Sequence, residues 1–202
     1  MRTLELFSGS RSFSKVMSKL GYSTFTVDNQ DFDNTDLVAD ILELDVKDLP
    51  EVDVIWASPP CTGFSVASIG THWTGGKNAY IPKTPTAQLG IDLVNKTIKI
   101  IEELKPKYWY IENPRGVLRK LELIGGIRHT ITYCQYGEER MKPTDIWTND
   151  PNWTPRPMCK NGMPCHIAAP RGSKTGTQGR AGAYERSMIP DQLFYEIAEG
   201  WA

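Results

Sequence analysis

The fold class is decided by the stretch TLELFSGSRSFSKVMSKLGYSTFTVD, residues 3–28. Residues 3–7 predict a short apolar strand, and the serine and glycine turn at 8–10 leads into an amphipathic segment. That segment stops at Gly21, a normal signal for the end of a helix, and residues 22–27 predict a second strand. The order of strand, glycine turn, helix and strand is typical of an α/β unit with a parallel sheet.

The rest of the chain extends this alternation. Residues 52–57 predict another strand, and residues 108–111 predict a further one that is rich in aromatic and branched side chains. Between them, apolar residues recur at helical spacing from 87 to 104, and Pro106 stops the pattern. A final helix is predicted over residues 191–199. We therefore expect an α/β fold in which helices cover both faces of a mostly parallel sheet.

Length and composition limit what the chain can be. With 202 residues and 22.7 kDa, we expect a single domain over residues 1–202. No run reaches the roughly 18 apolar residues of a spanning helix, and the first residues lack the pattern of a signal peptide, so we expect a cytoplasmic protein without membrane contact. Four scattered cysteines are too few for a disulfide scaffold. The net charge of -1 excludes an all-over basic coat, so nucleic-acid binding would need a local patch.

Small and polar residues gather at the predicted strand ends. They are Ser8 with Gly9, Asp28, Pro60 with Cys61, and Glu112 with Asn113. Because ligands of parallel sheets bind at the carboxyl ends of the strands, we expect these residues to converge. A glycine turn before a helix offers amide donors to an anionic group, although an ordinary turn would look the same. Asp28 stands where an acidic side chain can accept hydrogen bonds from a ribose.

Cys61 and Glu112 are the residues most suited to chemistry. Two prolines restrict the backbone before Cys61 and would hold its sulfur in a fixed place, with a buried structural thiol as the alternative. A thiol attacks as the thiolate, which a nearby cation or helix dipole favours. A half-buried carboxyl such as that of Glu112 can be held protonated and act as an acid, or it can form a plain salt bridge.

Five stretches of the chain resemble motifs of the DNA cytosine-5 methyltransferases. The family's cofactor, nucleophile and glutamate motifs are matched, in order and spacing, by LELFSGSRSFS, SPPCTGFS and YIENPRG. Its tyrosine-glycine and arginine-rich motif is similar to TYCQYGEERMKPTDIWTN, and its C-terminal cofactor motif to RSMIPDQLFYEI. The resemblance extends from residue 3 to about residue 198. It implies a compact member, of a kind that fits a bacterial cell or a phage-infected host, with a Rossmann-like fold that binds S-adenosylmethionine.

The resemblance implies methyl transfer to carbon 5 of a cytosine in double-stranded DNA. Cys61 would attack carbon 6 of a base flipped out of the duplex, and Glu112 would protonate or contact ring nitrogen 3. Arg140 would contact the base or a phosphate, with a solvated surface arginine as the alternative. The implied site for S-adenosylmethionine consists of Phe7, Ser8, Gly9, Asp28, Asp40, Ile41, Pro60 and Ser187.

The sequence departs from the family pattern without losing a reacting group. Thr62 follows the cysteine where glutamine is usual, and Pro114 follows Glu-Asn where valine is usual. In the arginine-rich motif the family's Gln, Arg and Arg are replaced by Arg140, Lys142 and Thr144. This replacement weakens any assignment of the second motif arginine, which the family uses to hold the target base.

Two segments are candidates for contact with DNA. Residues 63–86 form a long polar linker that we expect to be a mobile active-site loop, in which His72 and Trp73 could stack beside DNA or pack on the domain. Residues 151–184 form a basic Gly- and Pro-rich insertion, in place of the family's separate target-recognition region. The insertion contains no Asp or Glu, and its basic residues are Arg156, Lys160, Arg171, Lys174 and Arg180. We expect these basic side chains to contact DNA phosphates; the alternative is that they only form a solvated surface.

The small recognition region leaves two rival hypotheses open, together with the possible need for a partner. A partner subunit could supply the missing recognition surface. The enzyme could act on another pyrimidine, on single-stranded DNA or on RNA. The chain could also be a non-catalytic DNA-binding or regulatory protein that kept the cofactor pocket, although such a protein would not need both Cys61 and Glu112.

A possible structural zinc site lies in the stretch MCKNGMPCHIAAP. Cys159, Cys165 and His166 could supply three ligands to the metal, and Cys134 a fourth if the fold brings it close. The spacing is not that of a standard paired knuckle, so buried or free thiols are the alternative.

Overall fold

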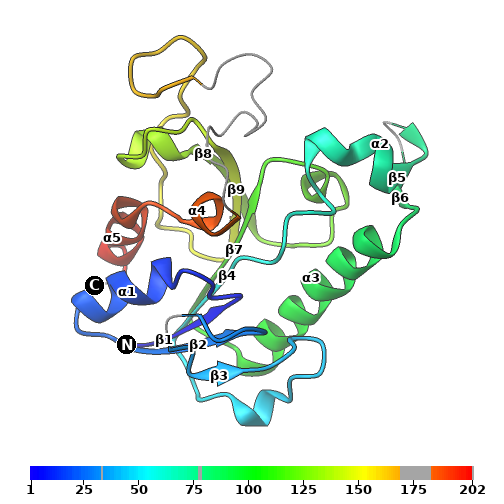
Figure 1. The fold of residues 1–202 in the computed structure, drawn as a ribbon. Helices are drawn as coiled ribbons and strands as arrows, with labels where there is room; N and C mark the ends of the chain where they lie inside the picture. Colours follow the sequence, from blue (N-terminus) through cyan, green and yellow to red (C-terminus); the bar gives the residue numbers. More distant parts are fainter. Residues whose placement is uncertain (33, 77–78, 169–182, 202) are drawn as a thin grey trace.

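The computed structural model describes residues 1–32, 34–76, 79–168 and 183–201. Its centre is a seven-stranded sheet in the order β3-β2-β1-β4-β7-β9-β8 (Figure 1). The five strands from β3 to β7 pair in parallel, whereas β9 runs antiparallel to both of its neighbours. The strands are β1 (Arg2–Leu6), β2 (Ser23–Asp28), β3 (Leu37–Val38), β4 (Val54–Ala57), β7 (Tyr108–Pro114), β8 (Ile127–Thr132) and β9 (Pro143–Thr148).

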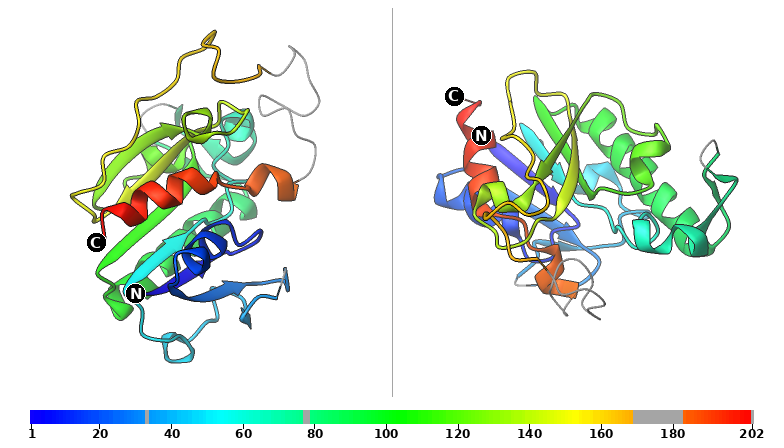
Figure 2. Two further views of the ribbon diagram at one scale, coloured as in Figure 1. Left: turned by 90° about the vertical axis from the view of Figure 1, so that its left-hand side faces the viewer. Right: turned by 90° about the horizontal axis from the view of Figure 1, so that it is seen from above.

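Helices cover both faces of this sheet. Figures 1 and 2 show α1 (Ser12–Lys19) and α5 (Asp191–Glu199) on one face and α3 (Pro85–Leu104) on the other. The shorter helical elements are η1 (Val46–Asp48), η2 (Val66–Ser68), α2 (Ile69–His72), η4 (Leu118–Lys120), η5 (Tyr133–Tyr136) and α4 (Ala183–Ser187). The predicted α/β class, with a mostly parallel sheet between two helical layers, is confirmed.

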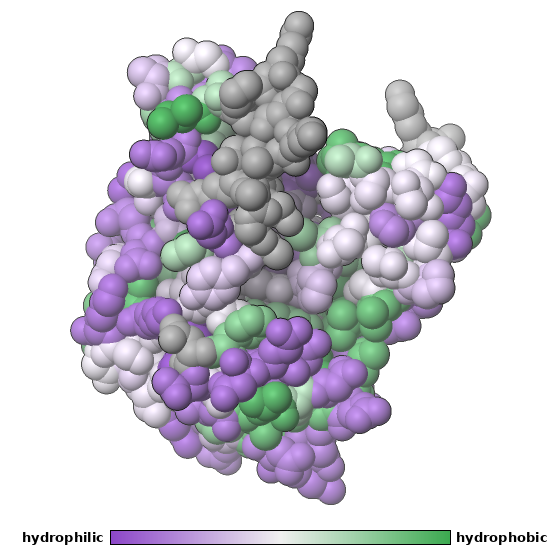
Figure 3. Space-filling model, viewed as in Figure 1, coloured by the Kyte–Doolittle hydropathy of each residue, from purple (hydrophilic) through white to green (hydrophobic). Residues whose placement is uncertain are grey.

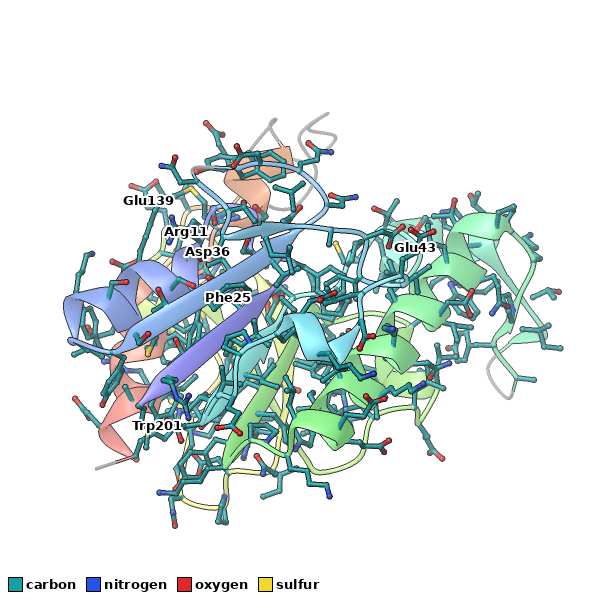
Figure 4. The ribbon with its side chains drawn as sticks, turned by 90° about the horizontal axis from the view of Figure 1, so that it is seen from below. Arg11, Phe25, Asp36, Glu43, Glu139 and Trp201 are labelled. Atoms are coloured by element: carbon teal, nitrogen blue, oxygen red, sulfur yellow. The ribbon has the colours of Figure 1, made fainter. Side chains whose placement is uncertain are left out.

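The two faces of the sheet have different cores. Alternate residues of β4 point to opposite sides, so that Ile55 packs under α3 in a mainly aliphatic cluster and Trp56 packs under α1 and α5 in an aromatic one. The Trp56 ring lies 5.7 Å from the ring of Phe13 in α1 and 4.8 Å from that of Phe194 in α5. Trp201 belongs to the aromatic cluster and lies near the start of β1 (Figure 4). Both helical layers are therefore held on the sheet by apolar burial.

The predicted helices are present, and their ends have local causes. The last helix has the predicted bounds, Asp191–Glu199. The long helix ends at Leu104 as predicted but begins two residues earlier, at Pro85. The reason is a cap: the Thr84 side chain accepts a hydrogen bond from the amide of Ala87, and Pro85 occupies the first turn, where a missing N–H has no cost.

The structure also differs from the sequence predictions. β7 continues to Pro114, so Glu112 and Asn113 lie within the strand rather than after it, because this end pairs with β9. β3, β8 and β9 were not predicted. The linker 63–86 carries η2, α2 and a small hairpin of β5 (Trp73–Thr74) and β6 (Ile81–Pro82). Among the helices of the described residues, none is long and apolar enough to cross a membrane.

Candidate active site

A cavity of about 340 Å³ opens at the carboxyl ends of the central strands. The surface is hollowed here, between the part that carries α2 and the part that carries β8 (Figure 3). Three strand ends contribute residues that the sequence analysis selected. Their side chains come from the β1 turn (Phe7, Ser8, Gly9), the β4 loop (Pro60, Cys61) and β7 (Glu112). The expected convergence of these strand ends is therefore present in the structure.

A second cavity, of about 270 Å³, adjoins the first. It is lined by the acidic side chains of Asp28 and Asp40 and by the apolar side chain of Ile41. The two cavities share Phe7, Ser58 and Pro60 as walls. Together they form an elongated site that is acidic at one end and contains Cys61 and Glu112 at the other, which suits a long ligand with a polar end.

The turn after β1 has an unusual backbone that opens it toward both cavities. Phe7 and Gly9 have positive φ angles of 59° and 43°. The amide of Gly9 donates to the Asp28 carboxylate at 2.9 Å, which ties the turn to the end of β2. The hydroxyl of Ser8 is buried and has no hydrogen-bond partner among the described residues. An unsatisfied buried hydroxyl at a cavity wall is a ready contact for a polar ligand.

Glu5 is a buried acid under the same turn. Its carboxylate accepts hydrogen bonds from the amides of Phe13 and Ser14 and from the Ser14 hydroxyl, at the first turn of α1. Burial raises the pKa of Glu5 to about 7, and the hydrogen bonds from Ser14 and Phe13 counteract part of that rise. Glu5 thus links the cavity floor to the start of α1.

The loop that carries Cys61 is fastened to β7. The side-chain amide of Asn113, itself fully buried, donates to the carbonyl of Pro59 at 2.9 Å. On the other side of Cys61, the carbonyl of Phe64 accepts from the amide of Val117 at 2.8 Å. A Cβ at Gly116 would lie 2.2 Å from that same carbonyl, so only glycine permits the approach. The Cys61 side chain is exposed, and hydrogen bonds at Pro59 and Phe64 hold the loop on both sides of it.

Glu112 lies in a buried polar cluster at the opposite wall. The hydroxyl of Tyr133 donates to Glu112 Oε1 at 2.9 Å, and Lys142 Nζ lies 3.8 Å from the same oxygen. Lys142 also lies 4.7 Å from the centre of the Tyr133 ring. Burial, followed by the charge of Glu112, raises the pKa of Tyr133 well above its ordinary value, so the phenol remains a proton donor. The cluster can hold Glu112 in one orientation and place a cation beside it.

Arg140 does not line this cavity. It is buried, pairs with Glu138, and donates to the backbone carbonyl of Met188 at 3.0 Å. Among the described residues that line the cavity, the cation is Lys142. Ser187, the predicted residue of the C-terminal motif, lines the cavity from α4, and its hydroxyl donates to the carbonyl of Tyr184.

The tryptophan side chain in the 63–86 segment packs on the protein. Trp73 is 4% exposed, stacks on the ring of Phe64, and donates to the carbonyl of Gly63. His72 bonds to the hydroxyl of Thr84 at the start of α3. Of the two alternatives for these residues, packing on the domain is the one the structure has.

A second group of functional side chains lies outside the cavity, and we call it the Cys/His cluster: Cys134, Cys159, Cys165 and His166. One ligand atom from each residue lies within 4.8 Å of every other. The sequence-predicted trio therefore does meet, and Cys134 joins it from η5. Hydrogen bonds from His166 and Cys159 lower the pKa of Cys165 to about 7, which favours its thiolate.

The basic insertion is only partly described. Arg156 is exposed, forms an ion pair with Glu196 of α5, and donates to the carbonyl of Gln135 at 2.6 Å. Lys160 is exposed. The other basic residues that we expected to contact DNA, Arg171, Lys174 and Arg180, lie outside the described residues.

Sequence reasoning did not select Glu5, Tyr133 or Lys142, which lie in or beside the cavity. Glu5 had a signal, because a charged residue at the centre of an apolar strand is rarely left without a function. Tyr133 and Lys142 had none that periodicity could detect, because they meet Glu112 only through the antiparallel pairing of β9.

Known proteins resemble this chain along its whole length. Residues 1–132 match the family model described as C-5 cytosine-specific DNA methylase. The "Probable DNA (cytosine-5)-methyltransferase" of Frog virus 3 is 31% identical over 219 residues, covering 98% of this chain and 99% of that protein. The type II methyltransferase M.CviJI of Paramecium bursaria Chlorella virus IL3A is 26% identical, and the match covers 96% of this chain but 58% of that larger protein.

Solved structures agree on the fold. A prophage-encoded protein from E. coli, described as a DNA modification methyltransferase, superposes with a TM-score of 0.54 at 16% identity, covering 99% of this chain and 69% of that one. A methyltransferase of Entamoeba histolytica superposes with a TM-score of 0.56 at 12% identity, covering 78% of this chain and 56% of that one. At these identities the likeness concerns the fold, which is that of the Rossmann-like methyltransferases.

Proposed function

The chain belongs to the family of C-5 cytosine-specific DNA methylases, and we propose that it transfers a methyl group from S-adenosylmethionine to carbon 5 of a cytosine in DNA. The observation that carries the proposal is the geometry of the joined cavities. An exposed thiol, Cys61, and a buried carboxyl, Glu112, line one end, and two strand-end aspartates line the other. A protein that only bound the cofactor would need the end with the two aspartates but not the end with Cys61 and Glu112.

The cofactor site fits S-adenosylmethionine. The carboxylate of Asp28 can accept from ribose hydroxyls, and Asp40 with Ile41 offers a polar and an apolar contact to adenine. The turn of Phe7, Ser8 and Gly9 lies between this end and Cys61, where the unpartnered Ser8 hydroxyl can bind the methionine part. Pro60 forms a wall of both cavities, and Ser187 closes the site from α4. When bound there, the cofactor supplies an electrophilic methyl group to the end that holds Cys61.

The protein's own residues activate the base. The Cys61 thiolate adds to carbon 6, and the electrons of the 5,6 double bond become a nucleophile at carbon 5. Glu112 contacts ring nitrogen 3 and supplies the proton that neutralises the ring. After carbon 5 is methylated, a base takes the carbon 5 proton, the 5,6 double bond re-forms as the Cys61 thiolate leaves, and nitrogen 3 returns its proton to Glu112. The charge of Lys142 and the hydroxyl of Tyr133 hold Glu112 toward the base.

The target cytosine must leave the stacked bases of the DNA duplex to reach this site. Since carbons 5 and 6 are attacked perpendicular to the ring, the cytosine enters the cavity flipped out of the duplex. The segment 63–86 borders the cavity through the Cys61 loop and covers the flipped base. The basic insertion 151–184 binds phosphates, which gives affinity but little sequence information, so a partner subunit could add the rest of the recognition surface.

Transfer of a labelled methyl group from S-adenosylmethionine tests this proposal. Duplex DNA, single-stranded DNA and cytosine-free DNA are compared with wild-type protein and with Cys61→Ser, a one-atom change. We expect 5-methylcytosine with wild type and duplex only, and a loss of at least about 1000-fold with Cys61→Ser while cofactor affinity stays within about twofold. DNA containing 5-fluorocytosine should trap the covalent adduct, because fluorine at carbon 5 cannot leave as the proton does.

The other outcomes identify the rivals. Label on single-stranded DNA, or on another pyrimidine, would change the substrate but keep the chemistry. Cofactor binding without label on any substrate, with Cys61→Ser unchanged in every respect, would show a binding protein that lacks turnover.

A further inference from the structure

We propose that the Cys/His cluster binds one zinc ion, which fastens the segment after β9 to η5. The inference goes beyond the methyl-transfer proposal and does not depend on it. Three thiols and one imidazole are a ligand set that closes a tetrahedral structural zinc site.

The spacing of the ligand atoms matches such a site. A tetrahedron with zinc–sulfur bonds of about 2.3 Å has edges of about 3.8 Å. The sulfur of Cys165 lies 3.8 Å from the sulfur of Cys134 and 3.8 Å from Nδ1 of His166. The sulfur of Cys159 lies 3.1 Å from that of Cys165 and 3.3 Å from Nδ1 of His166. These four separations lie between 3.1 and 3.8 Å, near the edges of a zinc tetrahedron, and all four ligand atoms lie within 4.8 Å of one another.

The backbone around the cluster holds it in this arrangement. The amide of Cys159 donates to the hydroxyl of Thr132 at 2.8 Å, and the amide of Ile167 donates to the carbonyl of Glu139 at 2.8 Å. Between them the chain reverses at Gly162, whose φ of 86° suits glycine. A turn docked at both ends brings Cys159, Cys165 and His166 back toward η5, and this preorganisation favours a metal site over thiols that meet by chance.

A disulfide explains this arrangement less well. A disulfide needs two sulfurs about 2.0 Å apart and has no use for a third thiol or for an imidazole. Here the sulfurs of Cys159 and Cys165 are 3.1 Å apart, and Cys134 and His166 belong to the same cluster. The convergence of four ligands, rather than two, points to a metal.

The proposed zinc has a defined structural task. The segment that supplies three of the ligands has few apolar contacts of its own, since Met158, Met163 and Ile167 are exposed. The fourth ligand, Cys134, is the neighbour of Tyr133, whose hydroxyl bonds to Glu112. Zinc would therefore fix the insertion to the sheet edge and steady the wall of the cavity from behind, without touching substrate.

Metal content of the purified protein tests the inference. We expect about one zinc per chain in wild type after dialysis, measured by mass spectrometry of the metals, and less than about 0.1 in Cys159→Ser and Cys165→Ser. Cys61→Ser is the matched control, because it makes the same change outside the cluster and should keep the full zinc content. His166→Cys, which restores four ligands, should keep zinc, whereas His166→Ser should lose most of it. Protein loaded with cobalt should show the intense visible bands of tetrahedral thiolate coordination.

Contrary results are equally specific. Zinc below about 0.1 per chain in folded wild type, or a Cys159–Cys165 disulfide in its peptide map, would overturn the inference. So would equal zinc in wild type and Cys159→Ser. If the serine variants fail to fold, the cobalt spectrum of wild type and the comparison of His166→Cys with wild type still decide. Because metal content is read without DNA or S-adenosylmethionine, failure here would leave the methyl-transfer proposal intact.

Discussion

Residues 1–132 and residues 133–201 build opposite walls of the same cavity by different physical means. The first part is a parallel sheet with apolar faces, in which Cys61 and Glu112 extend from ordered strand ends. The second part shares the aromatic core through α5 and adds polar contacts, including the Arg140 bond to the Met188 carbonyl and the Arg156 pair with Glu196. The reacting groups therefore come from the strand ends of the parallel sheet, and the groups that adjust them come from the polar contacts of the second part.

Replacing Glu112 by glutamine tests the first part with the largest expected effect. Glutamine keeps the size and can still accept from Tyr133, but it cannot deliver a proton to ring nitrogen 3. We expect turnover to fall by about 100- to 10,000-fold, with cofactor affinity measured by calorimetry nearly unchanged. Wild-type turnover in this variant would mean that the strand end does not supply the acid.

Lys142→Gln and Arg140→Gln form a matched pair in the second part. Lys142 lines the cavity near Glu112, so its loss should lower turnover by about 10- to 100-fold in a folded protein. Arg140 is buried in an ion pair away from the cavity, so its loss should lower the free energy of unfolding by about 3 kcal/mol. Turnover per folded molecule should change little in Arg140→Gln. Reversed results would return Arg140 to the role that the motif implied.

Glu5 makes the first part sensitive to pH. Its pKa of about 7 in the folded protein lies above the ordinary value of 4.5, so the folded state binds the proton more tightly. The stabilisation is complete below pH 4.5 and is lost as pH rises through 7, by up to about 3 kcal/mol. Urea unfolding of wild type and Glu5→Gln at several pH values measures this. The difference between the two proteins should change with pH in that window, and a constant difference would contradict the shift.

Arg156→Gln should have the smallest effect. The pair with Glu196 is partly exposed to solvent, so we expect at most about 1 kcal/mol of lost stability. Amide exchange in residues 151–168 should nevertheless quicken, because Arg156 also bonds to the carbonyl of Gln135. Lys19→Gln, which removes an exposed pair between α1 and α5, is the control and should leave that exchange unchanged.

The part of the fold that could be predicted has apolar residues at regular spacing and residues such as proline that mark where an element ends. The long helix is readable from its apolar spacing and from Pro106, and its true start needed only the Thr84 cap. By contrast, β9 was missed because PTDIWT contains polar residues that the fold buries, among them Thr144 and Asp145. Their burial follows from pairing with strands on both sides, which no local pattern encodes.

The same contrast holds for the site. Cys61, Asp28 and Glu112 could be selected because parallel strands end at one edge, a rule that needs only strand positions. Lys142 could not, since Arg140 and Lys142 share one short stretch and only the path into β9 decides which of them faces the cavity. Likewise, Cys134 joins the Cys/His cluster only through the fold.

The bond from Asn113 to the carbonyl of Pro59 has an evolutionary consequence. It joins the loop of the nucleophile to the strand of the acid, so the spacing of the two reacting groups is set within residues 1–132. Under the proposed function, substitutions confined to the insertion 151–184 would act on how DNA is held, while the bond-making pair keeps its alignment. A lineage with this arrangement could vary its grip on DNA through the insertion without realigning the reacting groups.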